Sequence, residues 1–181
     1  FHKALKTASY DRKKNAQKLI LEIKENLKIL IEWDGVCIQL PKRVVHYDTK
    51  INNFLFEKKT NKVVALIDLD TLMPGCILSD IGDMIRTYSN PVGEEYKDIS
   101  KVICNKTIVY GILDSFEKLC KLEELEKQNM FFGGLAITLM QSIRFLTDYL
   151  NNDIYYNINY ENQNLVRANN QFKLYQSLNE N

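Results

Sequence analysis

The centre of the sequence reads His46-Tyr47-Asp48-Thr49-Lys50-Ile51-Asn52-Asn53, followed at once by the apolar residues Phe54-Leu55-Phe56. After the polar turn Lys59-Thr60-Asn61, a second apolar run, Val63-Val64-Ala65-Leu66-Ile67, ends at Asp68. Two such runs around a polar turn predict a β-hairpin with a longer turn. Because a hairpin returns the chain to its starting point, we expect Asp68 to lie close to Asp48 and Asn53.

The residue types and spacing in this region suit phosphoryl transfer. A kinase needs a carboxylate to accept or orient the proton of the acceptor hydroxyl, and an amide oxygen five residues later to hold a metal ion on the phosphates. Asp48 and Asn53 have this spacing. A second carboxylate at a strand end, here Asp68, would bind the magnesium ion that bridges the transferred group. We predict Asp48 as the base, Asn53 and Asp68 as Mg²⁺ ligands, and ATP as the co-substrate.

Three neighbouring residues have supporting roles in this hypothesis. Lys50 would neutralise the charge that develops on the phosphoryl oxygens, and His46 would brace the loop. Asp70 either joins the metal ligands or hydrogen-bonds nearby backbone, since D-x-D pairs often only cap turns. A chance match to the H-x-D-x-x-x-x-N pattern occurs at roughly one in ten thousand positions. We therefore interpret the pattern as functional.

Most of the remaining chain is predicted to be helical, so the expected fold class is mainly α with one small β-hairpin. The first long helix should run from Asp11 to about Trp33 and end at Asp34-Gly35. Its apolar residues recur at three- and four-residue spacings, which is typical of an amphipathic helix. They are Leu19, Ile20, Ile23, Leu27, Leu30 and Ile31.

The second half of the chain continues this pattern. Pro74-Gly75 should break the chain after the hairpin, and Ser79 or Asp80 would cap a helix that begins near Ile81. Gly133-Gly134 marks a place where a later helix could be interrupted. Nothing in the sequence suggests a linker that divides residues 1–181 into separate domains. The further helical regions are expected at 94–119, 122–150 and 160–178.

Composition argues against several classes of partner and site. The 181 residues carry 24 Lys and Arg against 23 Asp and Glu, a net charge of +1, so the electrostatic signature of a nucleic-acid-binding protein is absent. The four cysteines form no C-x-x-C pair, which argues against zinc and favours reduced thiols in a cytoplasmic protein. Lys24, Glu25 and Arg144 interrupt the longest apolar runs, below the ~18 residues of a membrane span. We expect no nucleic-acid partner and no membrane partner.

Three segments resemble a known group of enzymes. They are HYDTKINN (46–53), IDLDTLMPG (67–75) and DIGDMIR (80–86), and a second block comprises RFLTDYL (144–150) and DIYY (153–156). Together they are similar to the phosphotransferase superfamily of aminoglycoside and choline kinases, whose fold resembles that of protein kinases. Within it they most resemble the bacterial N-acetylhexosamine 1-kinases. Tyr47 departs from the pattern, because that family usually has Asn at this position, and the change could alter loop packing or the sugar pocket.

The resemblance implies a reaction and further site residues. The γ-phosphoryl of ATP would pass to the anomeric hydroxyl of N-acetylglucosamine or N-acetylgalactosamine. Arg144 and Tyr155 would contact the sugar, although Arg144 also suits a buried ion pair and Tyr155 a surface aromatic. Asp80 and Asp83 would tie down the catalytic loop, with Arg86 as the partner of Asp83. The alternatives are an aminoglycoside, choline or homoserine kinase, and a non-catalytic binding module of the same fold.

The resemblance also implies a two-lobed enzyme whose smaller N-terminal lobe binds the nucleotide. The sequence contains neither a G-x-G-x-x-G nor a Walker loop, and its seven glycines are dispersed. We therefore interpret residues 1–181 as the C-terminal catalytic lobe of a protein-kinase-like α+β fold. The missing N-terminal lobe would be its first partner.

We expect the 181 residues alone to bind ATP weakly and to turn over no substrate, because half of the nucleotide site would belong to the missing lobe. Isothermal titration calorimetry with ATP and Mg²⁺ measures this directly. A dissociation constant in the micromolar range would contradict the expectation.

Overall fold

The computed structural model describes residues 1–180, and the chain forms two compact units. Unit 1 comprises Phe1–Glu32, Asn90–Cys104 and the chain from Thr138 onward, and unit 2 comprises Trp33–Ser89 and Asn105–Ile137. Helices dominate both units, which confirms the mainly α fold class. Each unit is assembled from separate segments, so no single linker marks the division in the sequence.

Unit 2 contains the predicted hairpin and a second sheet. β2 (Phe54–Phe56) and β3 (Val63–Leu66) pair antiparallel, as predicted. β1 (Arg43–Val45) and β4 (Met73–Gly75) form another antiparallel pair, so the hairpin is not the only sheet. These strands have three residues each, and Pro74-Gly75 lies within β4 instead of breaking the chain. Proline is tolerated in such edge strands because its missing N–H faces away from the ladder.

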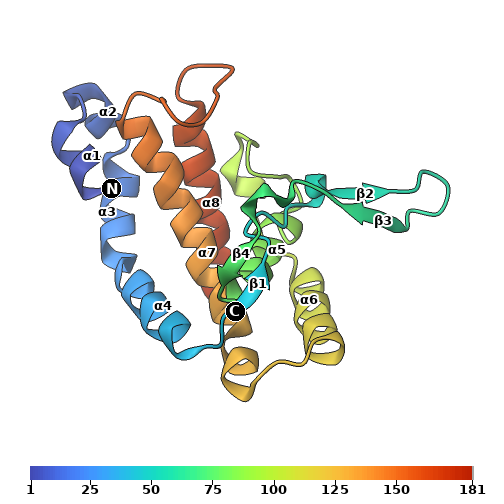
Figure 1. Cartoon of the computed structure of the whole chain (residues 1–181). Coiled ribbons are helices and arrows are strands. Elements are labelled where there is room, and N and C mark those ends of the chain that lie inside the picture. The colour runs from blue at the N-terminus through green and yellow to red at the C-terminus, as the bar shows by residue number, and fades with distance from the viewer. Residues whose placement is uncertain (181) are drawn as a thin grey trace. The chain divides into compact units, whose positions relative to one another are not determined.

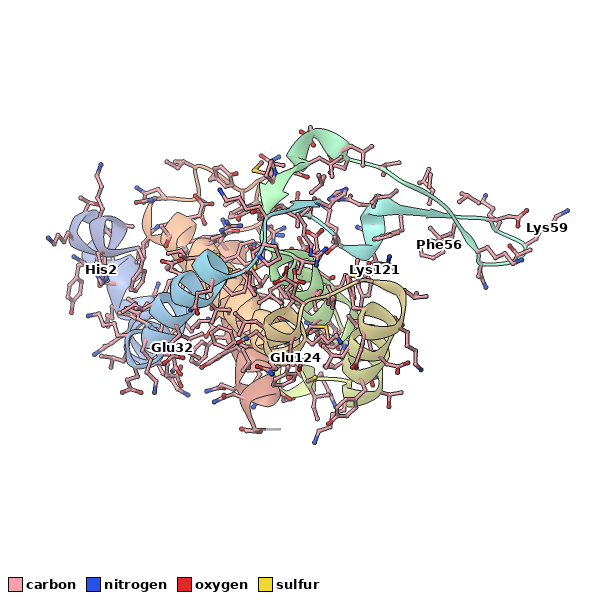
Figure 2. The ribbon with its side chains drawn as sticks, turned by 60° about the horizontal axis from the view of Figure 1, so that its bottom comes forward. His2, Glu32, Phe56, Lys59, Lys121 and Glu124 are labelled. Atoms are coloured by element: carbon pink, nitrogen blue, oxygen red, sulfur yellow. The ribbon has the colours of Figure 1, made fainter. Side chains whose placement is uncertain are left out.

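The β2–β3 hairpin projects away from the helices of unit 2 (Figure 1). Figure 2 shows Lys59 at its tip and Phe56 on the strand leading there. Much of its apolar surface is exposed, including Leu55, Phe56, Val63 and Val64. The base of the hairpin carries the residues of interest: Asn53 directly precedes β2, and Asp68 follows β3 with one residue, Ile67, between them.

The helices of unit 2 differ from the sequence-based prediction at their ends. α4 (Lys28–Gln39) continues through Asp34-Gly35, although Gly costs about 1 kcal/mol relative to Ala in a helix interior. Burial of Trp33 and Leu40 on either side offsets that cost. α5 (Leu78–Tyr88) begins after Ile77, so Ser79 and Asp80 lie in its first turn and do not cap it. The other helices of the unit are α6 (Lys106–Leu119) and the first half of α7 (Glu124–Leu150).

α5 and the first half of α7 approach each other through glycines. A Cβ on Gly82 would lie 2.4 Å from the Gly133 carbonyl oxygen, and a Cβ on Gly133 would lie 2.8 Å from the Leu78 carbonyl oxygen. Gly134 faces Ile85 with similar closeness. Gly133-Gly134 therefore does not interrupt α7, because the two glycines serve as the surface on which α5 packs.

An ion pair between a part-exposed arginine and a buried glutamate joins β1 to the start of α7 within unit 2. The Arg43 guanidinium donates to both carboxylate oxygens of Glu126 at 2.6 Å, and to the Lys121 carbonyl at 2.8 Å. Glu126 is fully buried and also accepts the Glu123 N–H. Burial alone would raise the pKa of Glu126, but the bonds from Arg43 and Glu123 lower it. Lys121 and Glu124 are labelled near this junction in Figure 2.

Unit 1 is built from helices. The predicted helix 11–33 is divided into α2 (Tyr10–Asn15), α3 (Gln17–Asn26) and the start of α4, and α1 (His2–Thr7) precedes them. α3 packs on α8 (Gln163–Asn179). Residues 94–105, predicted to be helical, instead form a loop with one short 3₁₀ turn, η3 (Ile99–Lys101).

The prediction that no segment is apolar enough to span a membrane does not hold for α7. By length and composition it is apolar enough to cross a membrane, despite Arg144, but more than half of its apolar window is buried inside the protein. A core helix of a soluble protein passes the same test. The buried residues of its second half include Leu139, Leu146 and Tyr149.

We expect Gly82→Ala to destabilise the protein by about 1–3 kcal/mol, the usual cost of overpacking, because backbone atoms oppose the added methyl group. Gly111→Ala in α6 is the matched control: no atom lies within 4 Å of its Cβ position, so higher helix propensity should stabilise it by up to about 1 kcal/mol. Urea unfolding followed by circular dichroism measures both changes. Equal stabilisation by the two substitutions would contradict the close approach of α5 and α7.

Candidate active site

The loop that follows β1 is held by a buried carboxylate from α5. Asp80 Oδ2 accepts the His46 N–H and Asp80 Oδ1 accepts the Tyr47 N–H, both at 2.8 Å. Burial raises the pKa of Asp80, while these two N–H groups oppose the rise. A buried carboxylate is stable only when its oxygens are hydrogen-bonded, so Asp80 and the loop fix each other.

A second set of bonds holds the loop from its other end. The Thr49 hydroxyl donates to the Asp80 carbonyl at 3.1 Å and lies 3.3 Å from Asp83 Oδ2. The Tyr88 hydroxyl donates to the Thr49 carbonyl at 2.7 Å. Arg86 pairs with Asp83 at 2.8 Å, as predicted. Asp80 and Asp83 therefore tie down the loop from within α5 and not from its cap.

His46 connects this loop to the strand that leads to Asp68. Its Nε2 lies 3.0 Å from the Ile67 carbonyl, and its Nδ1 lies 3.3 Å from the Asp48 N–H. A carbonyl only accepts and an amide N–H only donates, so the partners fit the tautomer with hydrogen on Nε2. The ring is 3% exposed, and its contacts join the loop to the residue that follows β3.

Asp48, Lys50 and Asn53 meet at the end of the loop. Asp48 Oδ2 accepts the Lys50 ammonium at 2.6 Å and the Asn53 amide at 2.9 Å. The Asn53 amide nitrogen also donates to the Asp48 carbonyl at 2.7 Å. Among residues 1–180, no side chain or backbone group bonds to Asp48 Oδ1 or Asn53 Oδ1. One oxygen of each residue is thus left for a ligand.

The end of the hairpin returns to the base of the loop, where carboxylates surround the Lys50 ammonium. Burial opposes the charged form, but the hydrogen bond to Asp48 and the negative charges of Asp48, Asp68 and Asp83 raise the pKa of Lys50 overall. The Ile67 N–H also donates to the Asn53 carbonyl at 2.9 Å. The hairpin therefore returns Asp68 to the base of the loop, where its side chain is exposed.

The donor set suits a hard divalent cation. Mg²⁺ in phosphoryl-transfer sites is usually held by one or two carboxylates together with phosphate oxygens. Among residues 1–180, no three His, Cys, Asp or Glu side chains form a metal-binding group of their own. The free amide oxygen of Asn53 and the exposed carboxylate of Asp68 could instead supply two of the Mg²⁺ ligands. Phosphate oxygens of a nucleotide would supply others.

Tyr47 adopts a backbone conformation that is costly for an aromatic residue. Its φ is +64°, in the left-handed region that Asn tolerates better than Tyr. A Cβ on Gly75 would lie 1.9 Å from the Tyr47 hydroxyl, so the ring occupies space that Gly75 leaves empty. Gly75 therefore makes room for the Tyr47 ring in this conformation.

The remaining predicted residues are not brought into this group by any contact. Asp70 is exposed in the 3₁₀ turn η2 (Leu69–Thr71) and bonds to none of Asp48, Lys50 or Asn53. Arg144 is exposed on the unit 1 half of α7, so its interpretation as a buried ion pair was wrong. Tyr155 also belongs to unit 1.

The segment that carries Tyr155 is firmly held within unit 1. The Asp148 carboxylate accepts the N–H groups of Tyr155 and Tyr156 at 2.9 and 3.0 Å. Asn164 donates to Asp148 and Asp153, both at 2.9 Å. The Tyr155 side chain itself is 80% exposed, so a fixed backbone presents an aromatic ring to solvent.

Sequence reasoning did not single out Thr49 or Tyr88. Both act through uncharged groups, a hydroxyl and a backbone carbonyl, and their partners lie more than 30 residues away. The T-K-x-N-N pattern contains Thr49, but residue type alone gives it no chemical role. Only the tertiary structure reveals these contacts.

One comparison with known proteins bears on the site. The model of the phosphotransferase enzyme family matches residues 2–101, slightly more than half of the chain. The match includes the loop after β1, the hairpin and α5, and therefore every residue placed in the group above.

We expect Asp80→Asn to lower the free energy of unfolding by about 1.5–3 kcal/mol, the range for hydrogen bonds to charged groups, because an amide oxygen can accept only one of the two N–H bonds. Hydrogen exchange at the His46 and Tyr47 amides should become faster. Asp114→Asn is the matched control, since Asp114 makes only a surface pair with Lys118 and should change stability by less than about 0.5 kcal/mol. Unchanged protection of both amides would contradict the role of the Asp80 carboxylate in holding the loop.

Proposed function

The chain belongs to the phosphotransferase enzyme family, and we propose that it transfers the γ-phosphoryl group of ATP to the anomeric hydroxyl of an N-acetylhexosamine, giving the sugar 1-phosphate. Membership indicates an ATP-dependent phosphotransferase of kinase-like fold. The choice of sugar is supported by the resemblance of the loop, the 67–75 segment and the start of α5 to N-acetylhexosamine 1-kinases.

The environment of Asp48 carries the proposal. Its Oδ2 is held by Lys50 and Asn53, while Oδ1 is left without a partner among the described residues. An acceptor hydroxyl that binds Oδ1 would have its proton oriented toward a fixed carboxylate. Phosphoryl transfer depends mainly on such positioning and on electrostatic stabilisation.

Lys50 and the metal ligands would supply the positive charge. Lys50 has three N–H donors and uses one on Asp48, so the others can reach the phosphoryl oxygens where negative charge develops. Asn53 and Asp68 would hold Mg²⁺, and Asp70 would join them or bind nearby backbone. When bound, Mg²⁺ supplies charge neutralisation between the phosphates.

The resemblance also suggests Arg144 and Tyr155 as contacts for the sugar. Arg144 is exposed on α7, and Tyr155 presents an exposed ring from a fixed backbone. A guanidinium has five N–H donors for sugar hydroxyls, and an aromatic ring can cover the apolar face of a sugar. We propose a cytoplasmic enzyme with no nucleic-acid or membrane partner. The four cysteines form no disulfide among the described residues, which is in keeping with this proposal.

A panel of acceptors tests the substrate. The intact protein that carries this chain should convert N-acetylglucosamine or N-acetylgalactosamine with ATP and Mg²⁺, measured by ADP release and by detection of the sugar 1-phosphate. Turnover confined to aminoglycosides, choline or homoserine would remove the sugar from the proposal. No turnover with any acceptor would support a non-catalytic binding module.

We expect Asp48→Asn to reduce turnover by about 10²–10⁴-fold, the usual contribution of a general base, with little change in thermal stability, because the pair with Lys50 is part-exposed. Asp114→Asn is again the control and should keep full turnover. Retained activity in Asp48→Asn would overturn the assignment of the base, even if the substrate were correct.

A further inference from the structure

Tyr47 directly precedes the proposed base, and its backbone conformation sets it apart from comparable positions in the chain. Among residues 1–180, six residues other than glycine have a positive φ. Five of these are Asn or Asp, whose short polar side chains tolerate the left-handed region: Asn61, Asp68, Asn152, Asp153 and Asn162. Tyr47 is the sixth, and its bulky ring gives no such local help. Its conformation therefore depends on contacts with other parts of unit 2.

Two contacts hold this conformation, one through the backbone and one through the ring. The Tyr47 N–H donates to Asp80 Oδ1 at 2.8 Å. The ring lies against Gly75 in β4, where a Cβ would be 2.6 Å from Tyr47 Cζ and closer still to the hydroxyl oxygen. Atoms that are not bonded do not approach so closely, so any side chain at position 75 would displace the ring.

Gly75 is needed for space and not for backbone freedom. It is buried in β4 and pairs with Arg43 of β1. Of the described glycines, Gly93 has a positive φ and Gly75 does not. Glycine inside a strand weakens it and often marks a place where another group approaches the backbone closely. Here the approaching group is the Tyr47 ring.

The turn at Tyr47 sets the direction in which the chain enters the candidate active site. Asp48 follows at once, and its backbone is held on both sides. Its N–H lies 3.3 Å from His46 Nδ1, and its carbonyl accepts the Asn53 amide at 2.7 Å. If Tyr47 left the left-handed region, the peptide between Tyr47 and Asp48 would rotate. These bonds and those of the Asp48 carboxylate could then not all be kept.

We propose that Tyr47 and Gly75 are a positioning pair for Asp48. The ring, packed on the glycine, holds the left-handed turn that directs the Asp48 carboxylate toward the acceptor hydroxyl. This inference rests on the proposed role of Asp48 as the base. Neither member of the pair touches the reacting atoms, so both act on the rate through the placement of Asp48. Displacement of a reacting group by about 1 Å can cost about 10²-fold in rate.

Kinetics of the intact protein that carries this chain test the pair. In Gly75→Ala, the added methyl group displaces the ring, so kcat should fall by about 10²-fold while the KM for ATP stays nearly unchanged. Addition of Tyr47→Asn should restore most of the lost kcat, because Asn is short and tolerates the left-handed region. Full activity in Gly75→Ala, or an equal loss with and without Tyr47→Asn, would overturn the proposal.

Val45 provides the matched control. Its Cγ2 is the other side-chain group near the added methyl, at 2.7 Å from the Cβ position of Gly75. Addition of Val45→Ala to Gly75→Ala removes this contact but leaves the Tyr47 ring in place, so kcat should not recover. Recovery with Val45→Ala and not with Tyr47→Asn would assign the effect to packing within β1 and β4, against the proposal.

Hydrogen exchange separates this inference from the proposed function. The Asp48 and Thr49 amides should exchange faster in Gly75→Ala, and their protection should return when Tyr47→Asn is added. This measurement needs no substrate, so it decides whether the pair holds Asp48 even if no acceptor is turned over. Unchanged exchange of both amides would overturn the pair. Faster exchange with an unchanged kcat on a confirmed acceptor would overturn the positioning role alone.

A second comparison serves if Gly75→Ala fails to fold. Tyr47→Ala and Tyr47→Asn both remove the ring, but alanine disfavours the left-handed region that Asn tolerates. Tyr47→Ala should therefore have the lower kcat and the faster exchange at Asp48. Equal kcat and equal exchange in the two variants would overturn the proposal.

Discussion

The structure of unit 2 depends on one buried carboxylate. Asp80 accepts two consecutive backbone N–H groups, from His46 and Tyr47, and thereby fixes the loop at the residue before Asp48. Burying this charge costs free energy that only well-formed hydrogen bonds offset. The same bonds hold Tyr47 in the left-handed region, a conformation it would not keep in isolation. Helix and loop are stable only together.

The candidate active site forms because further contacts hold three short segments around the Asp80 carboxylate and the loop that it binds. Thr49 and Tyr88 secure the far side of the loop on α5, and η1 (Ile51–Asn53) packs against the same helix. His46 binds the strand that precedes Asp68. Each link uses a buried or half-buried polar group with a defined partner. As a result, a loop of a few residues holds Asp48, Lys50 and Asn53 in fixed positions.

The sequence predicted the hairpin and the gathering of Asp48, Asn53 and Asp68, because both follow from local periodicity and turn position. It could not predict the β1–β4 sheet, since strands of three residues carry no periodic signal. The course of α4 past Gly35, and the exposure of Ile31 while Trp33 is buried, reflect tertiary packing that overrides propensity. The bonds of Thr49 and Tyr88 join residues distant in sequence, where spacing gives no information. The division of the chain into two units was not predicted either, because each unit is assembled from segments that are separated in the sequence.

Gly82 lies two residues after Asp80 on α5 and packs against the backbone of Gly133. The depth at which α5 sits on α7 therefore determines where the Asp80 carboxylate reaches the loop. Gly82 and Gly133 have no side-chain chemistry of their own. They nevertheless set the distance between α5 and α7, and through it the position of the proposed phosphoryl-transfer residues. A bulkier residue at either position would move α5, and the loop would have to shift with it. Substitution of one glycine should therefore require a compensating change at the other.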